Sequence, residues 1–407
     1  MTTTSDTALK EKLGRINSID LLQGIAVAIM ITTHVALWWD REAFIGQNNL
    51  FFAFFSFLGG FIAPTFLLLM GFNMRNSIAR RLSKGVSFSD IRRHLLKRGF
   101  AFLLIATLND LVMAILSVLV GQPENFLPWL ISWELFHIFG TTVLITYFLY
   151  EIFHQLKTRN IIKSINGPLM AFCVFILILI LIGTVLSQAI IGGDFSLNVL
   201  DPRNNVEILL FGEVANVGEA IQVAIARGPF SLFPFIAFGV LGVLLASLRL
   251  ALPTEGSWRK TMLGIGVFFA LIGGFLVIFL HIPIVFPINR YYLPSLSYIF
   301  WYWTGLIFAF LVSMAIFDAP SKAEKDRFRY VMPVARLSYL TLTIYYLQNL
   351  PFFLPNTLIP PSDTIMGIVV YTIVFLLYVS FYMVVAYFWE KKKFVYSMEW
   401  LLRKVTA

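Results

Sequence analysis

The stretch from Leu169 to Leu186 reads LMAFCVFILILILIGTVL and contains no charged residue. An α-helix rises about 1.5 Å per residue, so about 20 such residues cross the ~30 Å hydrocarbon core of a bilayer. We therefore predict that this stretch is a transmembrane helix. It contains Cys173, the single cysteine of the chain, so a disulfide framework and a cysteine-based metal site are excluded.

The composition of the whole chain also indicates a membrane protein. Of the 407 residues, 58% are hydrophobic and 13% are charged, whereas about a quarter of the residues are charged in soluble domains. Aromatic residues make up 16% and include 41 phenylalanines, which suits an exterior that faces lipid. A soluble globular fold is therefore not expected.

Further apolar stretches predict an all-α, polytopic membrane helix bundle of about ten transmembrane helices. The predicted spans are 19–39, 50–72, 99–120, 127–150, 167–187, 229–248, 262–282, 295–317, 334–354 and 365–389. We expect one transmembrane domain over residues 1–407, with a cytoplasmic N-terminal tail at 1–18. Residues 390–407 are expected to form a cytoplasmic amphipathic helix at the membrane interface, with Leu402 in the apolar layer and Arg403 toward the headgroups.

The distribution of lysine and arginine predicts the orientation. With both termini in the cytoplasm, the outer segments contain four of the 31 Lys and Arg residues, namely Arg41, Arg203, Arg227 and Arg290. The others lie at cytoplasmic ends and loops, as the positive-inside rule requires. The net charge of +9 is thus assigned to topology and not to nucleic-acid binding. The basic run 75–98 would also suit a cytosolic polyanion, such as a coenzyme with several phosphates.

Polar residues in the first helix are candidates for function, because ionisable groups at membrane depth are costly. Gln23 and His34 are eleven positions apart and lie nearly on one face, and Asp20 is offset by about 60°. The rise from Asp20 to His34 is roughly 21 Å, so the two cannot form a direct dyad. His34 is the best candidate for a general base, the alternative being a neutral histidine bonded between helices. Asp20 is interpreted as a cap of the helix N-terminus.

A second group of polar residues is predicted on the third and fourth helices. Asn109 and Asp110 lie in the middle of the third helix, where an aspartate needs a partner or a wet cavity. Glu134 and His137 are three residues apart on the fourth helix, so they share a face and can pair with each other or with Asp110. Either a shared hydrated cavity or a buried ion-pair network without chemistry is consistent with this pattern, and the cavity is favoured.

The predicted ninth helix contains an amide pair, Gln348 and Asn349. Such pairs either hold helices together in the membrane or bind substrate, and both interpretations are kept. The sequence contains no Gly-rich phosphate loop, zinc motif or nucleophile elbow, and no metal is expected.

The order of several motifs resembles the catalytic-domain family of heparan-alpha-glucosaminide N-acetyltransferase, within a wider group of transmembrane acyltransferases. The motifs are Arg15-Ile-Asn-Ser-Ile-Asp20-Leu-Leu-Gln-Gly24 with Met30 and His34, Ala63-Pro64-Thr65-Phe66 with Gly71, Leu95-Leu96-Lys97-Arg98-Gly99, and Pro234…Gly239…Gly242. The C-terminal part resembles a related family of uncharacterised bacterial membrane proteins. Its motifs are Arg336-Leu-Ser-Tyr-Leu-Thr-Leu-Thr, Tyr346-Leu-Gln348-Asn and Glu399-Trp-Leu-Leu-Arg403.

The resemblance implies a cytosolic acyl-CoA donor, expected to be acetyl-CoA, and an acceptor hydroxyl or amine reached from the outer side. It places His34 near the reaction centre, with Asp20 and Arg98 around the cytoplasmic part of a tunnel. Two features depart from the family. Gln23 stands where the family usually has arginine, and the outer loop 38–49 lacks the second histidine of the lysosomal enzymes.

The leading hypothesis is a multi-pass acyltransferase of the inner (plasma) membrane that acetylates an envelope sugar or glycan, with acyl-CoA, the acceptor and membrane lipids as partners. The main alternative is a proton-coupled transporter or exporter of a small solute or lipid-linked compound, in which buried Asp, Glu and His would relay protons. A structural protein is the third class considered, and a homodimer is left open.

Overall fold

The computed structural model describes residues 16–39, 54, 57–119, 126, 130, 135–191, 232–280, 296–318, 322–348 and 365–406. These residues are mainly helical, and no strand occurs among them. The long helices are α2 (Asn17–Trp39), α5 (Ile62–Ser83), α6 (Phe88–Leu119), α8 (Leu135–Thr158), α9 (Asn166–Ile191), α12 (Leu232–Ala251), α13 (Glu255–Ile278), α14 (Leu296–Phe317) and α17 (Ile365–Lys391). Shorter helices are α15 (Lys322–Leu337), α16 (Thr341–Leu347) and α18 (Met398–Thr406).

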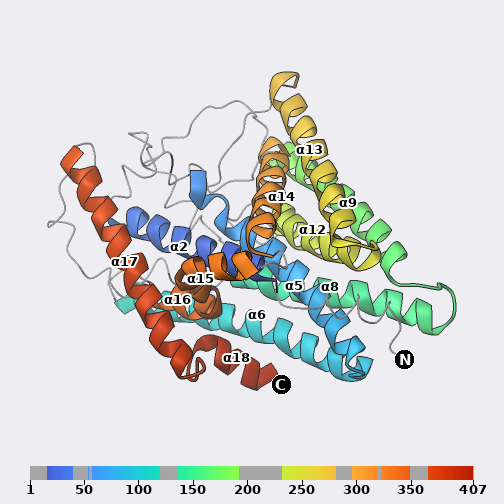
Figure 1. Cartoon of the computed structure of the whole chain (residues 1–407), viewed down its shortest axis with the longest axis horizontal. Helices are drawn as coiled ribbons and strands as arrows, with labels where there is room; N and C mark the ends of the chain where they lie inside the picture. Colours follow the sequence, from blue (N-terminus) through green and yellow to red (C-terminus); the bar gives the residue numbers. More distant parts are fainter. Residues whose placement is uncertain are drawn as a thin grey trace.

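Nine helices in the described part of the chain are long and apolar enough to cross a membrane. The predicted all-α membrane helix bundle is therefore confirmed. Figure 1 shows α17 on one flank of the bundle, packed on α15 and α2, with α9 and α13 on the opposite flank. Much of the surface of α6, α9, α13 and α17 is exposed although it is apolar, as expected for helices that face lipid.

The centre of the bundle is formed by α5 and α12. These two helices approach closely because each has a glycine that lies against the backbone of the other. A Cβ atom added at Gly71 of α5 would overlap the carbonyl oxygen of Gly239, and one added at Gly242 of α12 would overlap that of Leu68. Small residues at such positions let membrane helices pack by van der Waals contact. The sequence motifs that carry Gly71, Gly239 and Gly242 thus mark a single helix–helix interface.

One predicted span, 334–354, is not a continuous helix in the part that the structure describes. Helix α15 ends at Leu337, a 3-10 turn follows at Ser338–Leu340, and α16 ends at Leu347. Side-chain hydroxyls compete with the helix here, because Ser338 Oγ donates to Ala335 O and Thr341 Oγ1 donates to Ser338 O. Irregular backbone at membrane depth is tolerated where it lines a cavity, and this segment does so.

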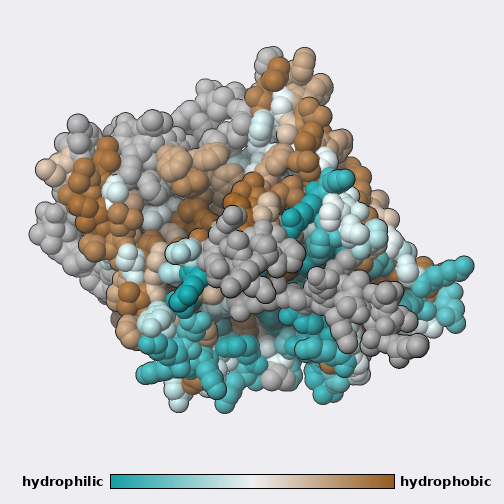
Figure 2. Space-filling view, viewed as in Figure 1, coloured by the Kyte–Doolittle hydropathy of each residue, from teal (hydrophilic) through white to brown (hydrophobic). Residues whose placement is uncertain are grey.

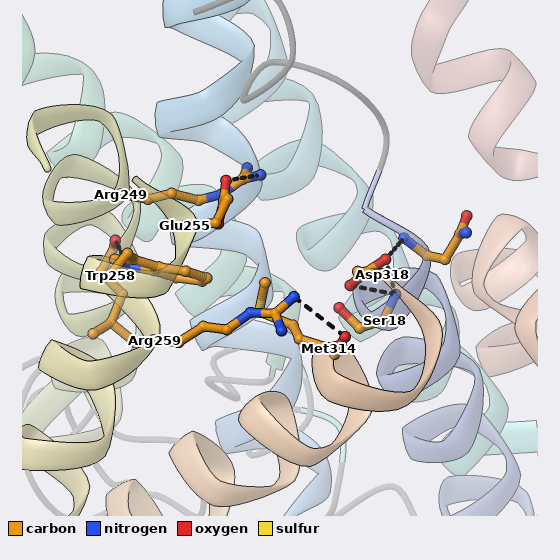
Figure 3. A network of polar contacts seen from close by, with 9 residues as sticks. Ser18, Arg249, Glu255, Trp258, Arg259, Met314 and Asp318 are labelled. Carbon is orange, nitrogen blue, oxygen red and sulfur yellow. Dashed lines mark hydrogen bonds and ion pairs between the residues drawn. The ribbon is translucent and has the colours of Figure 1, made fainter. Parts of the chain in front are cut away.

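Polar contacts join four helices at one end of the bundle (Figure 3). Glu255 at the start of α13 pairs with Arg249 of α12 at 2.7 Å, and Arg259 donates to the Met314 carbonyl of α14 at 3.4 Å. Asp318, just after α14, accepts from the backbone N of Asn17 at 2.7 Å. These contacts fix the start of α2.

Asp318 therefore provides the N-terminal cap of α2 that the sequence assigned to Asp20. It also accepts from the backbone N of Ser18 at 3.3 Å. Asp20 lies in the first turn and instead accepts from the Tyr339 hydroxyl at 3.5 Å. Burial raises the pKa of the Asp318 carboxyl, while its hydrogen bonds from Ser18 and Asn17 act in the opposite direction. A cap supplied from 300 residues away cannot be predicted from local sequence.

Hydrophilic side chains gather along the lower edge of the molecule in Figure 2, where α18 and the adjoining ends of α5 and α6 lie in Figure 1. Apolar side chains cover much of the surface above this edge. The bundle thus has one strongly polar end, and this is the end that the positive-inside rule predicts to be cytoplasmic.

Candidate functional site

An inner cavity of about 680 Å³ opens at the polar end of the bundle. It lies between α2, α5, α6, α8, the broken segment 338–342, the end of α17 and α18. Its lining consists of Gln23, Phe66, Leu69, Met70, Asn73, Met74, Ser77, Arg80, His94, Leu95, Arg98, Phe102, Phe136, Phe139, Ser338, Tyr339, Thr341, Leu342, Glu390, Phe394, Glu399, Leu402 and Arg403.

A second cleft of about 750 Å³ adjoins the inner cavity on the side of α6 and α18. The two hollows share His94, Arg98, Glu399, Leu402 and Arg403. The outer cleft adds cations, because Arg81, Arg93 and Lys97 also line it. A cationic cleft therefore adjoins a cavity that also has aromatic and methionine side chains in its walls.

The charges around the two hollows favour an anionic ligand. Six lysine and arginine side chains line the hollows, against the three carboxylates of Asp90, Glu390 and Glu399. Glu390 is also paired with Arg336, whose Nε lies 2.6 Å from its Oε2, so the cations exceed the acidic groups left to balance them. Clustered cations in a cleft with apolar walls raise the local concentration of anions.

Arg98 is the cation best placed at the junction of the two hollows. Its guanidinium lies over the Phe102 ring, 5.8 Å from the centroid. Its Nε is buried and has no hydrogen-bond partner among the residues described. The charged group that acts on it is Arg81, of the same sign. A guanidinium held in this way has donors left for a phosphate, which it binds as a planar fork.

Gln23 is fixed in the wall of the inner cavity by the broken segment. Its Nε2 donates to Thr341 Oγ1 at 3.0 Å and to the Ser338 carbonyl at 3.3 Å. The departure from arginine at this position thus places a neutral amide in the cavity, bonded to the 3-10 turn. Asp20, one turn earlier, contacts the cavity residue Tyr339.

His34 lies beyond the inner cavity, behind a layer of aromatic rings. Phe136 lines the cavity, and its ring is 4.6 Å from that of Tyr345, centroid to centroid. The Tyr345 ring is 6.3 Å from the His34 imidazole, edge to face. Tyr346 stacks on Phe136 at 5.6 Å. His34 lines neither hollow, and these ring contacts connect the wall of the inner cavity to its imidazole.

The immediate partner of His34 is Gln348, at the end of α16. The Gln348 side chain and the Met30 carbonyl are close enough to act on the imidazole. His34 Nδ1 and Gln348 Oε1 nevertheless have no regular hydrogen bond within the described segments, and neither does the Thr33 hydroxyl. Three polar groups that can bind an acceptor thus lie on or beside α2 and α16.

Asp110 and His137 form a buried pair between α6 and α8. The His137 Nε2 lies 3.6 Å from Asp110 Oδ2, and both residues are buried. Neither residue lines the inner cavity or the outer cleft, and neither does the neighbouring Asn109. The structure thus pairs His137 with Asp110, which is one of the two pairings predicted from the sequence. Glu134 and Asn349 lie outside the described residues.

Several features of the site could not be read from the sequence. His94 lies in α6, with its Nδ1 2.7 Å from the Thr406 carbonyl and its Nε2 3.1 Å from Arg81. Leu402 and Arg403, expected at the lipid interface, instead line the cavity. Arg75, counted with the basic run, is buried and unavailable to a polyanion.

Arg75 connects three helices near the polar end. Its Nε donates to Ser247 Oγ of α12 at 3.2 Å, and one terminal nitrogen donates to Asn166 Oδ1 of α9 at 2.5 Å. Its guanidinium also lies over the Tyr150 ring of α8, 5.2 Å from the centroid. Such contacts depend on tertiary packing, and the sequence contained no signal for them.

The fold and the site together define a multi-pass membrane protein with a basic cavity at one end and a histidine deeper in the bundle. Residues 15–199 match the family described as "Heparan-alpha-glucosaminide N-acetyltransferase, catalytic". This match confirms the resemblance over the first part of the chain and implies a membrane acyltransferase with an acyl-CoA co-substrate. The resemblance of the C-terminal part to a second family stays a prediction. A search of curated proteins gives no match.

The matched segment contains α2, α5, α6, α8 and α9, so it includes His34, Gln23 and Arg98. The remaining walls of the cavity, at 338–342, Glu390 and α18, come from beyond it. Among the residues that the structure describes, no group of three His, Cys, Asp or Glu could hold a metal ion. The walls of the inner cavity thus come from both the matched segment and the part of the chain beyond it.

Proposed function

We propose that the protein transfers an acyl group, acetyl in the simplest case, from cytosolic acyl-CoA to a sugar or glycan acceptor on the outer side of the inner membrane. The observation that carries the proposal is the unpaired Nε of Arg98 at the junction of two cation-lined hollows, within the segment that matches the acetyltransferase family.

The donor is proposed to enter from the polar end. The phosphates of CoA would bind in the outer cleft, where Arg81, Arg93, Lys97 and Arg98 gather. The long pantetheine arm would follow the apolar wall of the inner cavity past Gln23. Gln23 and His34 are eleven residues apart, about 16 Å along the helix axis, so a thin extended arm suits the remaining path.

The aromatic layer implies a movement before reaction. Phe136 and Tyr345 lie between the cavity and His34, so the thioester must displace one of these rings to reach the imidazole. Phe136 is buried, so such a movement requires the surrounding side chains to shift as well. Closed rings in the absence of donor would also keep water and protons from crossing the bundle.

The chemistry assigned to His34 is general base catalysis. The imidazole removes the proton from the acceptor hydroxyl or amine as the acceptor oxygen or nitrogen forms a bond to the acyl carbon. The carbon–sulfur bond then breaks, and the CoA thiolate takes the proton back from the imidazolium. Thr33 and Gln348, beside His34, are the groups proposed to stabilise the oxyanion.

The test is acetyl transfer by purified protein. Wild type with radiolabelled acetyl-CoA and a panel of envelope sugars is expected to give labelled product, and His34→Ala is expected to bind acetyl-CoA but give none. His154→Ala is a matched control, because His154 stacks on Phe88 at 3.7 Å and lines neither hollow. Product from both wild type and His34→Ala would remove His34 from the mechanism. Absence of both product and donor binding would favour the proton-coupled transporter.

A further inference from the structure

The motif Glu399-Trp-Leu-Leu-Arg403 forms the first part of α18, and the proposed chemistry does not use it. Residues four apart share a helix face, and both Glu399 and Arg403 line the inner cavity and the outer cleft. Trp400 lies on another face, with its ring 4.8 Å from the Lys404 ammonium. The acidic and basic ends of the motif are thus turned toward the proposed donor site.

The Glu399 carboxylate is engaged by the start of α16. It accepts hydrogen bonds from the backbone N of Leu342 and, at 3.1 Å, from that of Thr343. The Thr343 hydroxyl donates to Glu399 Oε2 at 2.6 Å and accepts from the backbone N of Met398 at 2.9 Å. A carboxylate at this position satisfies free N–H groups and complements the helix dipole. These contacts join the start of α18 to the start of α16.

The other end of α16 reaches His34. The helix has seven residues, about 10 Å at 1.5 Å per residue. Near its end, Tyr345 packs against the His34 imidazole, and Gln348 follows directly after the helix and acts on the same ring. Glu399 holds the start of α16. The position of α16 in turn determines the positions of the Tyr345 and Gln348 side chains.

We propose that Glu399 is a positioning residue for the reaction at His34. It fixes α16, and α16 holds Gln348 beside the imidazole and Tyr345 in the aromatic layer. Because Glu399 also borders the donor cavity, it links the cavity to the reaction centre through one short helix. This inference rests on the proposed function for its kinetic consequence, while its structural consequence can be measured without any turnover.

A simpler role for Glu399 would be an anchor of the C-terminal helix alone. An anchor would change the yield and thermal stability of the protein but not the turnover of the molecules that fold. A ligand of the donor would change KM for the donor. A positioning residue would change kcat, because a displacement of about 1 Å at a reaction centre can cost up to about 100-fold in rate.

The kinetic test compares E399Q with E255Q. Glu255 is an acidic residue that is paired with Arg249 and lines neither hollow. We expect E399Q to lower kcat of monodisperse protein by about 10- to 100-fold with little change in KM for the donor, and E255Q to leave both unchanged. Thr343→Val should reproduce the loss and Thr343→Ser should not, because serine keeps the hydroxyl that donates to Glu399.

The structural test uses a cysteine pair, H34C with Q348C, in a chain that also carries Cys173→Ala. Oxidation is expected to cross-link the pair in the parent, and adding E399Q is expected to abolish or delay the cross-link. If E399Q changes neither kcat nor the cross-linking, the proposal is overturned, and Glu399 only anchors the C-terminal helix. If the wild type shows no acetyl transfer, the proposed function fails, and the cross-link alone decides whether Glu399 positions α16.

Discussion

Arg98→Gln is the substitution expected to weaken donor binding most specifically. It removes the guanidinium at the junction of the two hollows, whose Nε has no partner in the described part of the chain. A hydrogen bond to a charged group contributes about 1.5–3 kcal/mol. Arg98 is partly exposed, so the lower part of that range, about 1.5–2 kcal/mol, applies to a phosphate bound there.

This energy corresponds to a rise in Kd for acetyl-CoA of about 10- to 30-fold, at ~1.4 kcal/mol per factor of ten. Arg98→Lys should fall between wild type and Arg98→Gln, because lysine keeps the charge but loses the planar fork. The thermal midpoint of Arg98→Gln should stay the same or rise, because the charge acting on Arg98 is the like charge of Arg81.

The assay is equilibrium binding of radiolabelled acetyl-CoA to purified protein in detergent at two salt concentrations. Arg259→Gln is the matched control, since Arg259 donates to the Met314 carbonyl and lines neither hollow. Wild-type binding should weaken with salt, as for charges screened by ions. Equal affinity in wild type and Arg98→Gln, or the same loss in Arg259→Gln, would refute the assignment of Arg98 to the donor phosphates.

Three further predictions concern stability. Gly71→Ala should lower the free energy of unfolding by about 1–3 kcal/mol through overpacking against α12, whereas Gly264→Ala, with nothing within 4 Å of the new Cβ, should be neutral or stabilising; equal losses in thermal unfolding would contradict this. Asp110→Leu should cost about 1–3 kcal/mol because His137 loses a buried contact, and adding His137→Leu should recover part of the cost; fully additive losses in the double variant would argue against coupling. Burial raises the pKa of the Glu399 carboxyl above its usual 4.5, so the folded state binds this proton more tightly than the unfolded state does. Protonation of Glu399 therefore stabilises the fold at low pH, and this contribution is lost as pH rises from 4.5 through the folded pKa. The thermal midpoint of wild type relative to E399Q should therefore be higher at pH 5 than at pH 7.5, and a difference independent of pH would contradict the direction of the shift.

The sequence predicted the membrane bundle because long apolar runs carry their own signal. The run at Leu169–Leu186 has enough length and no charge, and it lies within α9. The same logic failed at 334–354. There, hydroxyls of Ser338 and Thr341 and the distant carboxylate of Glu399 satisfy backbone groups that a continuous helix would otherwise pair, and apolar content does not reveal such contacts.

The candidate site was predicted only in part. Gln23 and Arg98 meet at one cavity, and the motifs that carry them were visible in the sequence. The ring contacts beside His34 and the position of His94 depend on contacts between helices far apart in the chain. The spacing of Glu399 and Arg403 was a usable signal, because residues four apart share a helix face, but the partner of that face could not be deduced.

The most direct measurement of the central claim is acetyl transfer across a sealed membrane. Proteoliposomes would receive radiolabelled acetyl-CoA on the side of the basic cavity, with a panel of envelope sugars trapped inside. We predict labelled product in the lumen for wild type and none for His34→Ala. Label that reaches only acceptors on the donor side, or proton-coupled movement of solute without any loss of acetyl-CoA, would contradict the account.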